Sequence, residues 1–404
     1  MEQIEEILKR NVVEMIEEKS LRKKLESGKK LRIKIGADPT APDLHLGHVV
    51  VLDKLRQFQE ADHQVIFLIG DFTAKIGDPS GKSKTRPSLS EEEIKKNAKT
   101  YFEQVGKILD TKKVEIRYNS EWYQKMEVDD FIELTSNFSL WRISERDDFE
   151  KRRKAGVEVG YHEGAYSIMQ AYDSVELKAD VEIGGTDQKF NLLAGRSLMK
   201  KLGQVPQDVI TLPLLVGLDG KKKMSKSLNN YIGITDEPNE MFGKVMSISD
   251  KMIIDYARFA SGMEDFEVKE MEKEIKLGEN PKIIKERLAV QIVKRFYDEP
   301  KAEKARERFN LQFVKKEIPK DIPEKSFKLG VCENLPQMLM DLKLVGSKSE
   351  AKRLVSEGAV KVDSAKIEDP QAPICIHNGM IIQVGKRRFL RIKEKTGLDN
   401  NYKK

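Results

Sequence analysis

The stretch LRIKIGADPTAPDLHLGHVVVLDKLRQFQEADHQVIFLIG, residues 31–70, decides the fold that we expect for this chain. LRIKIGA is predicted to be a strand, and the text after it spaces apolar side chains by three, as in a helix packed by one face, at Val49, Leu52, Leu55 and Phe58. QVIFLIG is a continuous apolar run, which is typical of a buried parallel strand. Together they predict a βαβ unit with a glycine-containing turn, a layout that places ligands at the carboxyl ends of the strands.

Other segments extend this unit into several domains. Further strands are predicted in VEIRYNS, ADVEIGG and VITLPLLVG, while residues 1–30 are helical in character, so residues 1–228 are predicted to form an α/β domain with a doubly wound parallel sheet. Residues 229–320 are polar and helical and predict a separate helical domain. KKEIPKDIPEKS has prolines among charges, which predicts a linker at 321–334. Residues 335–404 predict a small α+β domain with one capped amphipathic helix.

Composition limits the classes of protein. No apolar run approaches the roughly 18 residues of a membrane span, and MEQIEEILKR is not a secretion signal, so we expect a cytoplasmic location without membrane contact. Cys332 and Cys375 are too few for a disulfide framework or a cysteine-rich zinc site. Residues 345–404 hold 13 Lys or Arg and 7 Asp or Glu, which accounts for the whole net charge of +6. This basic module suggests a nucleic-acid contact, although a solvated surface explains it equally well.

His45 and His48 stand three residues apart around Gly47. If a helix begins near Asp43 or Leu44, both histidines lie beside free backbone N–H groups and the positive end of the dipole, where phosphate binds naturally. Gly47 would let a nucleobase approach the backbone, and two imidazoles could donate to a phosphate under attack. A surface or capping pair is the simpler interpretation of an isolated H-x-x-H, and zinc lacks further Cys or His ligands.

GKKKMSKSLNN, residues 220–230, is a loop rich in cationic donors, with Lys223 and Lys226 beside two serines. A triphosphate fits such a loop, although consecutive lysines in a loop are more often simply solvated. The conjunction of this loop with the histidine pair, at opposite ends of one α/β domain, favours ATP as the ligand.

HLGH and KMSKS match the two signatures of the class I aminoacyl-tRNA synthetases, and DPTAPDLHLGH, IGDPSGK, YSIMQAYDS and IGGTDQKFN resemble the bacterial tyrosyl-tRNA synthetases, over essentially the whole chain. The resemblance implies a Rossmann-like catalytic domain with a dimer-forming insertion at about 120–160, a helical anticodon-binding domain and an S4-like RNA-binding domain. It implies a tyrosine-tRNA ligase, which converts L-tyrosine and ATP to tyrosyl-adenylate and pyrophosphate and then charges the 3′ end of tRNA(Tyr). A homodimer is expected, with Mg²⁺ bound to ATP mainly through phosphates.

The resemblance also assigns residues on the ATP side. Those expected to stabilise the attacked phosphate and the departing pyrophosphate are His45, His48, Lys82, Arg86, Lys223 and Lys226. Those expected to bind ATP are Gly36, Asp38, Thr40, Gly47, Gly184, Gly185, Asp187 and Lys226. IGDPSGKSKTR is not a phosphate-binding P-loop, because Gly77 and Gly81 stand four apart where that motif needs five.

Residues expected at the tyrosine are Lys34, Asp78, Tyr166, Gln170, Asp173 and Gln188, with Asn119 and Trp122 lining or supporting the pocket. Three of them fall at i, i+4 and i+7 of one helix face, which the pattern alone would make a solvent face. By resemblance Asp78 holds the ammonium and Asp173 meets the phenol hydroxyl, which phenylalanine would leave unpaired. The family's better-known members have a tyrosine where this chain has Lys34. Lys34 could donate to the phenol, pair with Asp173 or point away.

The basic tail resembles an S4-type module, and the residues expected to contact tRNA through phosphates are Lys348, Lys352, Arg353, Lys386, Arg387, Arg388 and Arg391. Three alternatives stay open. A tryptophanyl enzyme is disfavoured by YSIMQAYD and Asp173. A nucleotidyltransferase that never touches RNA is disfavoured by the tail, and a non-catalytic RNA-binding protein is disfavoured by the intact histidine and lysine motifs.

Overall fold

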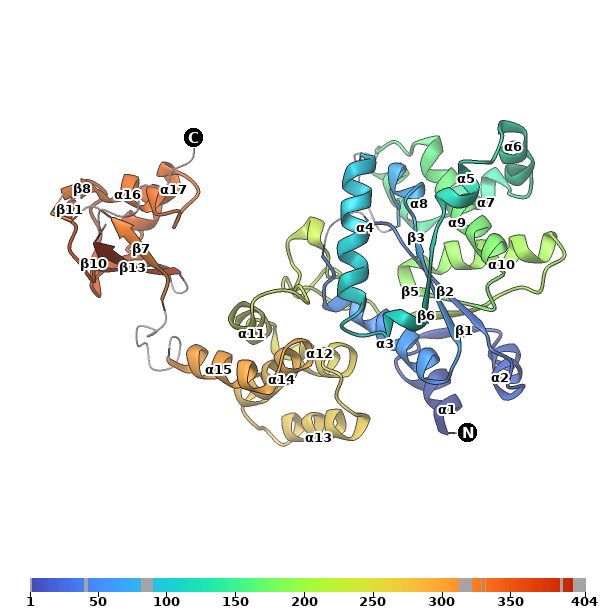
Figure 1. Ribbon diagram of the computed structural model, residues 1–404, viewed down its shortest axis with the longest axis horizontal. Coiled ribbons are helices and arrows are strands. Elements are labelled where there is room, and N and C mark those ends of the chain that lie inside the picture. The colour runs from blue at the N-terminus through green and yellow to red at the C-terminus, as the bar shows by residue number, and fades with distance from the viewer. Residues whose placement is uncertain are drawn as a thin grey trace. The chain divides into compact units, whose positions relative to one another are not determined.

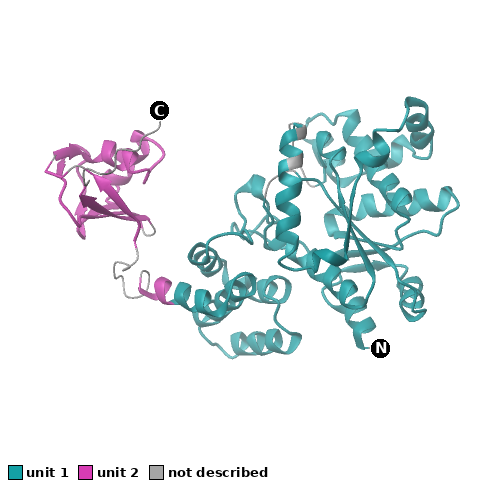
Figure 2. Ribbon diagram, viewed as in Figure 1, with its two compact units in different colours: residues 1–306 teal, residues 307–404 magenta. Residues whose placement is uncertain are grey.

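A computed structural model describes residues 2–39, 43–80, 90–311, 322–327, 329–330, 332–385 and 388–394. The chain forms two compact units, residues 1–306 and 307–404 (Figures 1 and 2). No helix among the described residues is long and apolar enough to cross a membrane. The residues singled out from the sequence that lie outside the described parts are Thr40, Lys82, Arg86, Lys386 and Arg387.

Unit 1 contains a six-stranded sheet in the order β1-β6-β5-β2-β3-β4. The strands are β1 (Glu14–Ile16), β2 (Arg32–Ala37), β3 (Gln64–Ile69), β4 (Val114–Tyr118), β5 (Val181–Gly185) and β6 (Asp208–Leu212). All neighbours pair in parallel except β1, which runs antiparallel to β6. From β2 the chain builds outward to β3 and β4 and then returns to β5 on the other side of β2. Strand order reverses between β2 and β5, and ligands of such sheets bind at that point.

Helices flank this sheet (Figure 1). They are α1 (Glu2–Lys9), α2 (Glu18–Glu26), α3 (Leu46–Glu60), α4 (Glu91–Val105), α9 (Tyr161–Leu177) and α10 (Lys189–Lys201). Between β4 and α9 lie four shorter helices, α5 (Ser120–Tyr123), α6 (Val128–Ser136), α7 (Leu140–Ser144) and α8 (Asp147–Lys154). The predicted apolar stripe of α3 is buried, at 2% exposure or less, at Val49, Leu52, Leu55 and Phe58. The βαβ prediction is therefore confirmed.

The first 30 residues differ from the helical prediction, because β1 separates α1 from α2. Three residues of β1 pair with β6, with Glu14 opposite Thr211 and Ile16 opposite Val209. A strand this short owes its conformation to its partner strand, since its own sequence carries no recognisable alternation.

The helical segment that follows the sheet comprises α11 (Pro238–Met246), α12 (Ile253–Ala260), α13 (Asp265–Lys276), α14 (Pro281–Phe296) and α15 (Glu299–Phe309). Most of it belongs to unit 1, whereas the sequence suggested a separate domain. The reason is contact with the sheet domain: α12 packs on α3, and Arg295 of α14 forms an ion pair with Asp53 of α3.

Unit 2 has a five-stranded sheet, β10-β9-β12-β13-β7, and a two-stranded sheet, β11-β8. Its elements are β7 (Glu324–Phe327), β8 (Cys332–Asn334), α16 (Leu335–Asp341), α17 (Lys348–Ser356), β9 (Val360–Val362), β10 (Ala365–Ile367), β11 (Pro373–Cys375), β12 (Ile381–Val384) and β13 (Arg388–Glu394). The predicted cap of α17 is present, with Ser347 Oγ accepting from the Glu350 N–H at 3.1 Å. Unit 2 is therefore a small α+β unit, as expected.

The predicted linker at 321–334 is corrected where the structure describes it. β7 pairs in parallel with β13, and Phe327 at its end packs on the core of unit 2. β8 pairs with β11, and a disulfide joins Cys332 to Cys375 across them. Proline and charge suggest a linker, but these short strands are held by partners that lie at least 39 residues away in sequence.

Candidate active site

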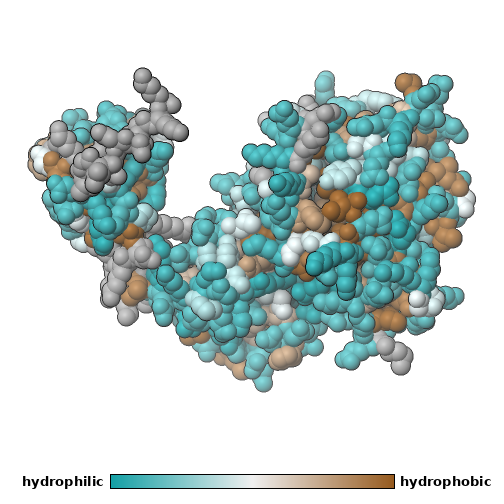
Figure 3. Space-filling model, in the orientation of Figure 1, coloured by the Kyte–Doolittle hydropathy of each residue, from teal (hydrophilic) through white to brown (hydrophobic). Residues whose placement is uncertain are grey.

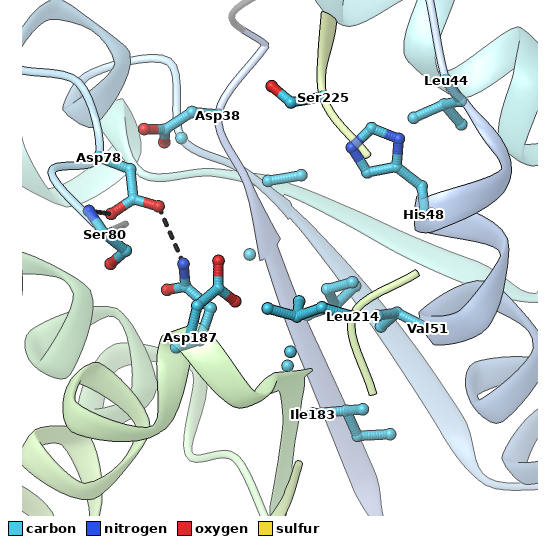
Figure 4. Close-up of a pocket in the computed structure, with 18 of the residues that line it drawn as sticks. Asp38, Leu44, His48, Val51, Asp78, Ser80, Ile183, Asp187, Leu214 and Ser225 are labelled. Carbon is cyan, nitrogen blue, oxygen red and sulfur yellow. Dashed lines mark hydrogen bonds between the residues drawn. The ribbon is translucent and has the colours of Figure 1, made fainter. Parts of the chain in front are cut away.

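A cavity of about 710 Å³ lies at the carboxyl ends of β2 and β5, where the strand order reverses. This volume is usual for a small-molecule site. Figure 4 shows Asp38, Asp78 and Asp187 on one side of the cavity and His48 on the other. The residues predicted from the sequence that line it are Gly36, Asp38, His45, Gly47, His48, Asp78, Tyr166, Gln170, Asp173, Gly184, Gly185, Asp187, Gln188, Lys223 and Lys226.

The start of α3 fixes the histidine pair. His45 is the N-cap residue, its backbone N–H donates to His48 Nδ1 at 3.1 Å, and the two rings stack with centroids 3.8 Å apart. A Cβ on Gly47 would lie 3.0 Å from the His45 ring, so glycine allows that ring its place. The helix begins at Leu46, slightly later than expected. The capping and functional interpretations are compatible, because the cap uses only one nitrogen of His48.

Both imidazoles are neutral near pH 7. Burial, followed by the charges of Lys226 and Lys223, lowers the pKa of His48 to about 4. Burial also lowers the pKa of His45 well below its ordinary value, with His48 and Lys226 adding to the effect. Since Nδ1 of His48 accepts a hydrogen bond, its proton is on Nε2, which can donate to a ligand. Nδ1 of His45 is buried and has no hydrogen-bond partner among the described residues.

Carboxylates hold the two lysines of KMSKS at the cavity. Lys223 Nζ lies 2.5 Å from Asp187 Oδ2, and Lys226 Nζ lies 2.7 Å from Asp43 Oδ2. Asp187 follows β5 and Asp43 precedes α3, so the two pairs connect the loop to both sides of the cavity. An entering polyphosphate would meet two cations whose partners it can replace.

Asp173 is buried on α9 and accepts three hydrogen bonds. Trp122 Nε1 donates to its Oδ1 at 3.1 Å, and Asn119 Nδ2 donates to its Oδ2 at 3.4 Å. Tyr123 Oη, which shares its one proton between Asp173 and the Met169 carbonyl, donates to Oδ1 at 3.0 Å. Burial raises the pKa of the Asp173 carboxyl to about 7, against the opposing charge of Lys34 and the three donors. Oδ2 has only one long hydrogen bond and keeps room for a further donor from the cavity.

Asp78 and Gln188 form a second polar group in the lining. Gln188 Nε2 donates to Asp78 Oδ2, and the Ser80 N–H donates to Asp78 Oδ1, both at 2.9 Å (Figure 4). Gln170, one turn along α9 from Tyr166, has a buried Oε1 with no hydrogen-bond partner in the described part of the chain. An unpaired buried acceptor in a cavity that is also lined by a carboxylate is suited to a cationic donor such as an ammonium.

Lys34 lies behind the cavity and is not part of its lining. Its buried ammonium lies 2.8 Å from Glu182 Oε1 and donates to Ser174 Oγ at 2.7 Å and to the Gln170 carbonyl at 3.3 Å. The hydroxyl and the carbonyl thus accept two hydrogen bonds from the ammonium, and the Glu182 carboxylate balances its charge. The expectation that Lys34 binds tyrosine directly is therefore corrected. Of the three orientations left open, Lys34 points away, and it reaches Asp173 only through its charge.

Sequence reasoning missed two contributors, Tyr123 and Asp43. Tyr123 follows Trp122 in YNSEWYQ, but only the packing of α5 against α9 brings its hydroxyl to Asp173. Asp43 stands two residues before His45, and its role depends on the loop at Lys226, 183 residues away. Nothing in the sequence around Tyr123 or Asp43 indicates these contacts, apart from the motif residues beside them.

Comparison with known proteins identifies the family. Residues 3–314 match the family model described as tRNA synthetases class I (W and Y). A curated tyrosine-tRNA ligase of Oleidesulfovibrio alaskensis is 50% identical over 392 residues, 97% of this chain and 98% of the relative. One of Mannheimia succiniciproducens is 51% identical over 385 residues, 95% of this chain and 97% of the relative.

A solved tyrosyl-tRNA synthetase of Archaeoglobus fulgidus, complexed with L-tyrosine, is 26% identical, with a TM-score of 0.62 over 76% of this chain and 99% of that chain. The relatives named here are all tyrosyl enzymes, in agreement with the interpretation of YSIMQAYDS. The chain belongs to the class I tRNA synthetases and, within them, to the bacterial tyrosine-tRNA ligases, which use ATP to charge tRNA with tyrosine.

Proposed function

We propose that ATP lies with its α-phosphate at the start of α3 and that tyrosine lies between Asp173 and Asp78. The tyrosine carboxylate attacks the α-phosphorus; an oxygen–phosphorus bond forms, the bond to pyrophosphate breaks, and tyrosyl-adenylate results. A ribose hydroxyl at the 3′ end of tRNA then attacks the carbonyl carbon, and AMP leaves. No side chain acts as a nucleophile, so positioning and charge stabilisation supply the rate.

The single observation that carries this proposal is the convergence of neutral imidazoles and lysines on one cavity. His48 Nε2 donates to the attacked phosphate, while Lys223 and Lys226 exchange their carboxylate partners for the departing pyrophosphate. Asp187, once released from Lys223, accepts a hydrogen bond from a ribose hydroxyl. The phosphate roles expected from the sequence are kept for His45, Lys82 and Arg86. Thr40 and the cavity glycines keep their expected role in binding ATP. Mg²⁺ bound with ATP, mainly through phosphates, would supply positive charge that neutralises the phosphates.

The amino acid is held at both ends in this proposal. Asp78, supported by Tyr166, Gln170 and Gln188, receives the ammonium, and Gln170 Oε1 is the acceptor still unpaired in the described structure. At the other end the phenol donates to Asp173 Oδ2. A ligand without that hydroxyl would leave the buried carboxylate short of a donor, which disfavours phenylalanine.

Unit 2 is proposed to bind tRNA through phosphates. Lys348, Lys352 and Arg353 are exposed on α17, whose opposite face buries Ala351 and Val355. Arg388 opens β13, and Lys386 and Arg387 keep their expected role from the sequence. This agrees with the location of the entire net positive charge in residues 345–404.

A homodimer is proposed through the insertion between β4 and α9. Exposed apolar side chains concentrate there, each at least 60% exposed, at Val128, Ile132, Leu140 and Trp141, and Tyr161 at the start of α9 is 79% exposed. Figure 3 shows hydrophobic surface at the end of unit 1 where Figure 1 places α6 and α7. Several exposed apolar side chains within one segment are typical of a protein interface.

Removing a phosphate-facing group should slow activation without weakening tyrosine binding. His48→Ala and Lys226→Met are each expected to lower the rate of tyrosine-dependent pyrophosphate exchange into ATP by about 10²-fold or more, because each removes a donor to developing charge. Lys222→Met, in the same loop but exposed, is the matched control and should exchange normally. Normal exchange in both active-site variants would contradict the assignment.

Tyrosine affinity should depend on Asp173 ionisation. Because the carboxyl is protonated below its pKa of about 7 in the empty pocket, affinity should rise about tenfold between pH 6 and pH 8 and then level off. The histidines, with pKa values lowered to about 4 or well below 6.5, do not titrate in this window. Asp173→Asn should flatten the pH profile and reduce discrimination against phenylalanine, measured by equilibrium binding. A variant that keeps the wild-type profile would exclude Asp173.

The double variant Lys348→Gln/Lys352→Gln should weaken tRNA binding and leave pyrophosphate exchange intact. The slope of log K against log salt should fall by roughly 0.9 for each lost phosphate contact, measured by titration with tRNA(Tyr). Lys366→Gln, which removes the same kind of charge from β10, is the control. If that control lowers the slope as much per charge as the double variant does, the effect reflects net charge and not contact at α17.

Charges in the apolar patch should break the dimer. Leu140→Asp/Trp141→Asp is expected to give half the mass of the wild type in light scattering, because burying two carboxylates in an interface is unfavourable. Phe266→Asp/Leu277→Asp, at residues that are 70% and 77% exposed on another surface, should leave the mass unchanged. A wild-type monomer, or an unaffected dimer in the first variant, would refute this interface.

A further inference from the structure

Arg146, the residue before α8, is buried behind the Asp78 group, with 4% of its surface exposed. It donates from Nε and Nη2 to the two oxygens of Asp148 at 3.1 and 3.0 Å. Nη2 also donates to Ser80 Oγ at 3.1 Å, and Nη1 donates to Asn191 Oδ1 at 2.9 Å and to Ser167 Oγ. All five N–H groups are thus used. Asp148 balances the charge, and Ser80, one of the other three partners, lines the cavity.

Arginine has donors and no acceptor, so it sets the direction of the hydrogen bonds that follow. Because Asn191 turns its carbonyl oxygen to Arg146, its amide nitrogen faces the other way and donates to Gln188 Oε1 at 3.1 Å and to Ser80 Oγ at 3.3 Å. Gln188 must then present its own NH₂ to Asp78 Oδ2. The Ser80 N–H holds the second oxygen of Asp78. Both oxygens of Asp78 are therefore oriented by groups that Arg146 fixes.

Two aromatic rings lie close to the Arg146 guanidinium. Its guanidinium carbon lies 4.7 Å from the centroid of Phe149 and 5.4 Å from that of Phe190. Phe149 belongs to α8 and Phe190 to α10, so the guanidinium contacts both the insertion and the helix that carries Asn191. A guanidinium with five satisfied donors and two ring contacts has a single arrangement. It therefore also fixes the orientation of the side chains that accept its hydrogen bonds.

We infer that Arg146 is a positioning residue for the amino-acid substrate, which holds Asp78 and Gln188 in the arrangement that receives the ammonium. The inference deepens the proposed function and rests on the role assigned there to Asp78. Arg146 itself touches no substrate atom. Its effect should be confined to the ammonium and absent from the phenol and from ATP.

Two ligands separate this role from general support of the fold. L-Tyrosine and 3-(4-hydroxyphenyl)propanoic acid differ only in the amino group, so the dissociation constant of the propanoic acid divided by that of L-tyrosine reports on the ammonium site. In Arg146→Met this ratio should fall about tenfold, mainly through weaker tyrosine binding, because an oriented bond to a charged group is lost. KM for ATP should stay at the wild-type value. Arg146→Lys, which keeps the charge beside Asp148, should give an intermediate ratio and carries the test if the methionine variant does not fold.

The matched control is Arg152→Met, which removes another buried arginine, within α8, that forms an ion pair with Glu163 at 2.5 Å. Its ratio should equal that of the wild type, even where thermal unfolding shows lower stability. An unchanged ratio in the Arg146 variants, or equal weakening of both ligands, would overturn the inference. Asp78→Asn distinguishes an error in the ammonium site from an error in the role of Arg146. If Asp78→Asn leaves the ratio unchanged, the proposed ammonium site is wrong; if it lowers the ratio and Arg146→Lys does not, only the role of Arg146 is wrong.

Discussion

The buried ion pair between Lys34 and Glu182 is the constraint on which the catalytic crevice depends. The two residues are register partners on β2 and β5, the strands between which the sheet order reverses, and neither side chain is more than 1% exposed. Moving either charge from water into the core costs several kcal/mol unless the other is present, and removing one partner of such a pair costs about 3–5 kcal/mol. The sheet can carry these charges here only as a pair.

This pair also sets the position of α9, which carries much of the tyrosine pocket. The Lys34 ammonium donates to Ser174 Oγ and to the Gln170 carbonyl, and Ser174 Oγ in turn donates to Glu182. These contacts hold the helix over the β2 and β5 ends, so that Gln170 and Asp173 face the cavity. The side chain that replaces the family's tyrosine thus acts through the scaffold, and the phenol site is built by donors to Asp173 from α5 and the residue before it.

How far the sequence predicts this molecule depends on the range of the contacts. The β2-α3-β3 unit, the helical segment and α17 have local signals, namely apolar runs, three-residue spacing and a serine cap, and all were predicted. β1, β7 and β8 were not, because strands of three or four residues take their conformation from distant partners. The histidine and lysine motifs line one cavity, as the family resemblance implies. The sequence does not predict the position of Lys34 or the roles of Tyr123 and Asp43, because these depend on which side chains the fold brings beside them.

The balance of forces at Asp173 explains how a carboxylate can select a phenol. Burial favours the protonated form, while Lys34 and three hydrogen-bond donors favour the ionised form, and the result is a pKa of about 7. The group is therefore close to the point at which one more donor decides its state. Tyrosine supplies that donor and favours the carboxylate. Phenylalanine would displace water from Asp173 and supply none, so the carboxyl would have to take up a proton or stay charged with fewer partners, and either outcome opposes binding near neutral pH.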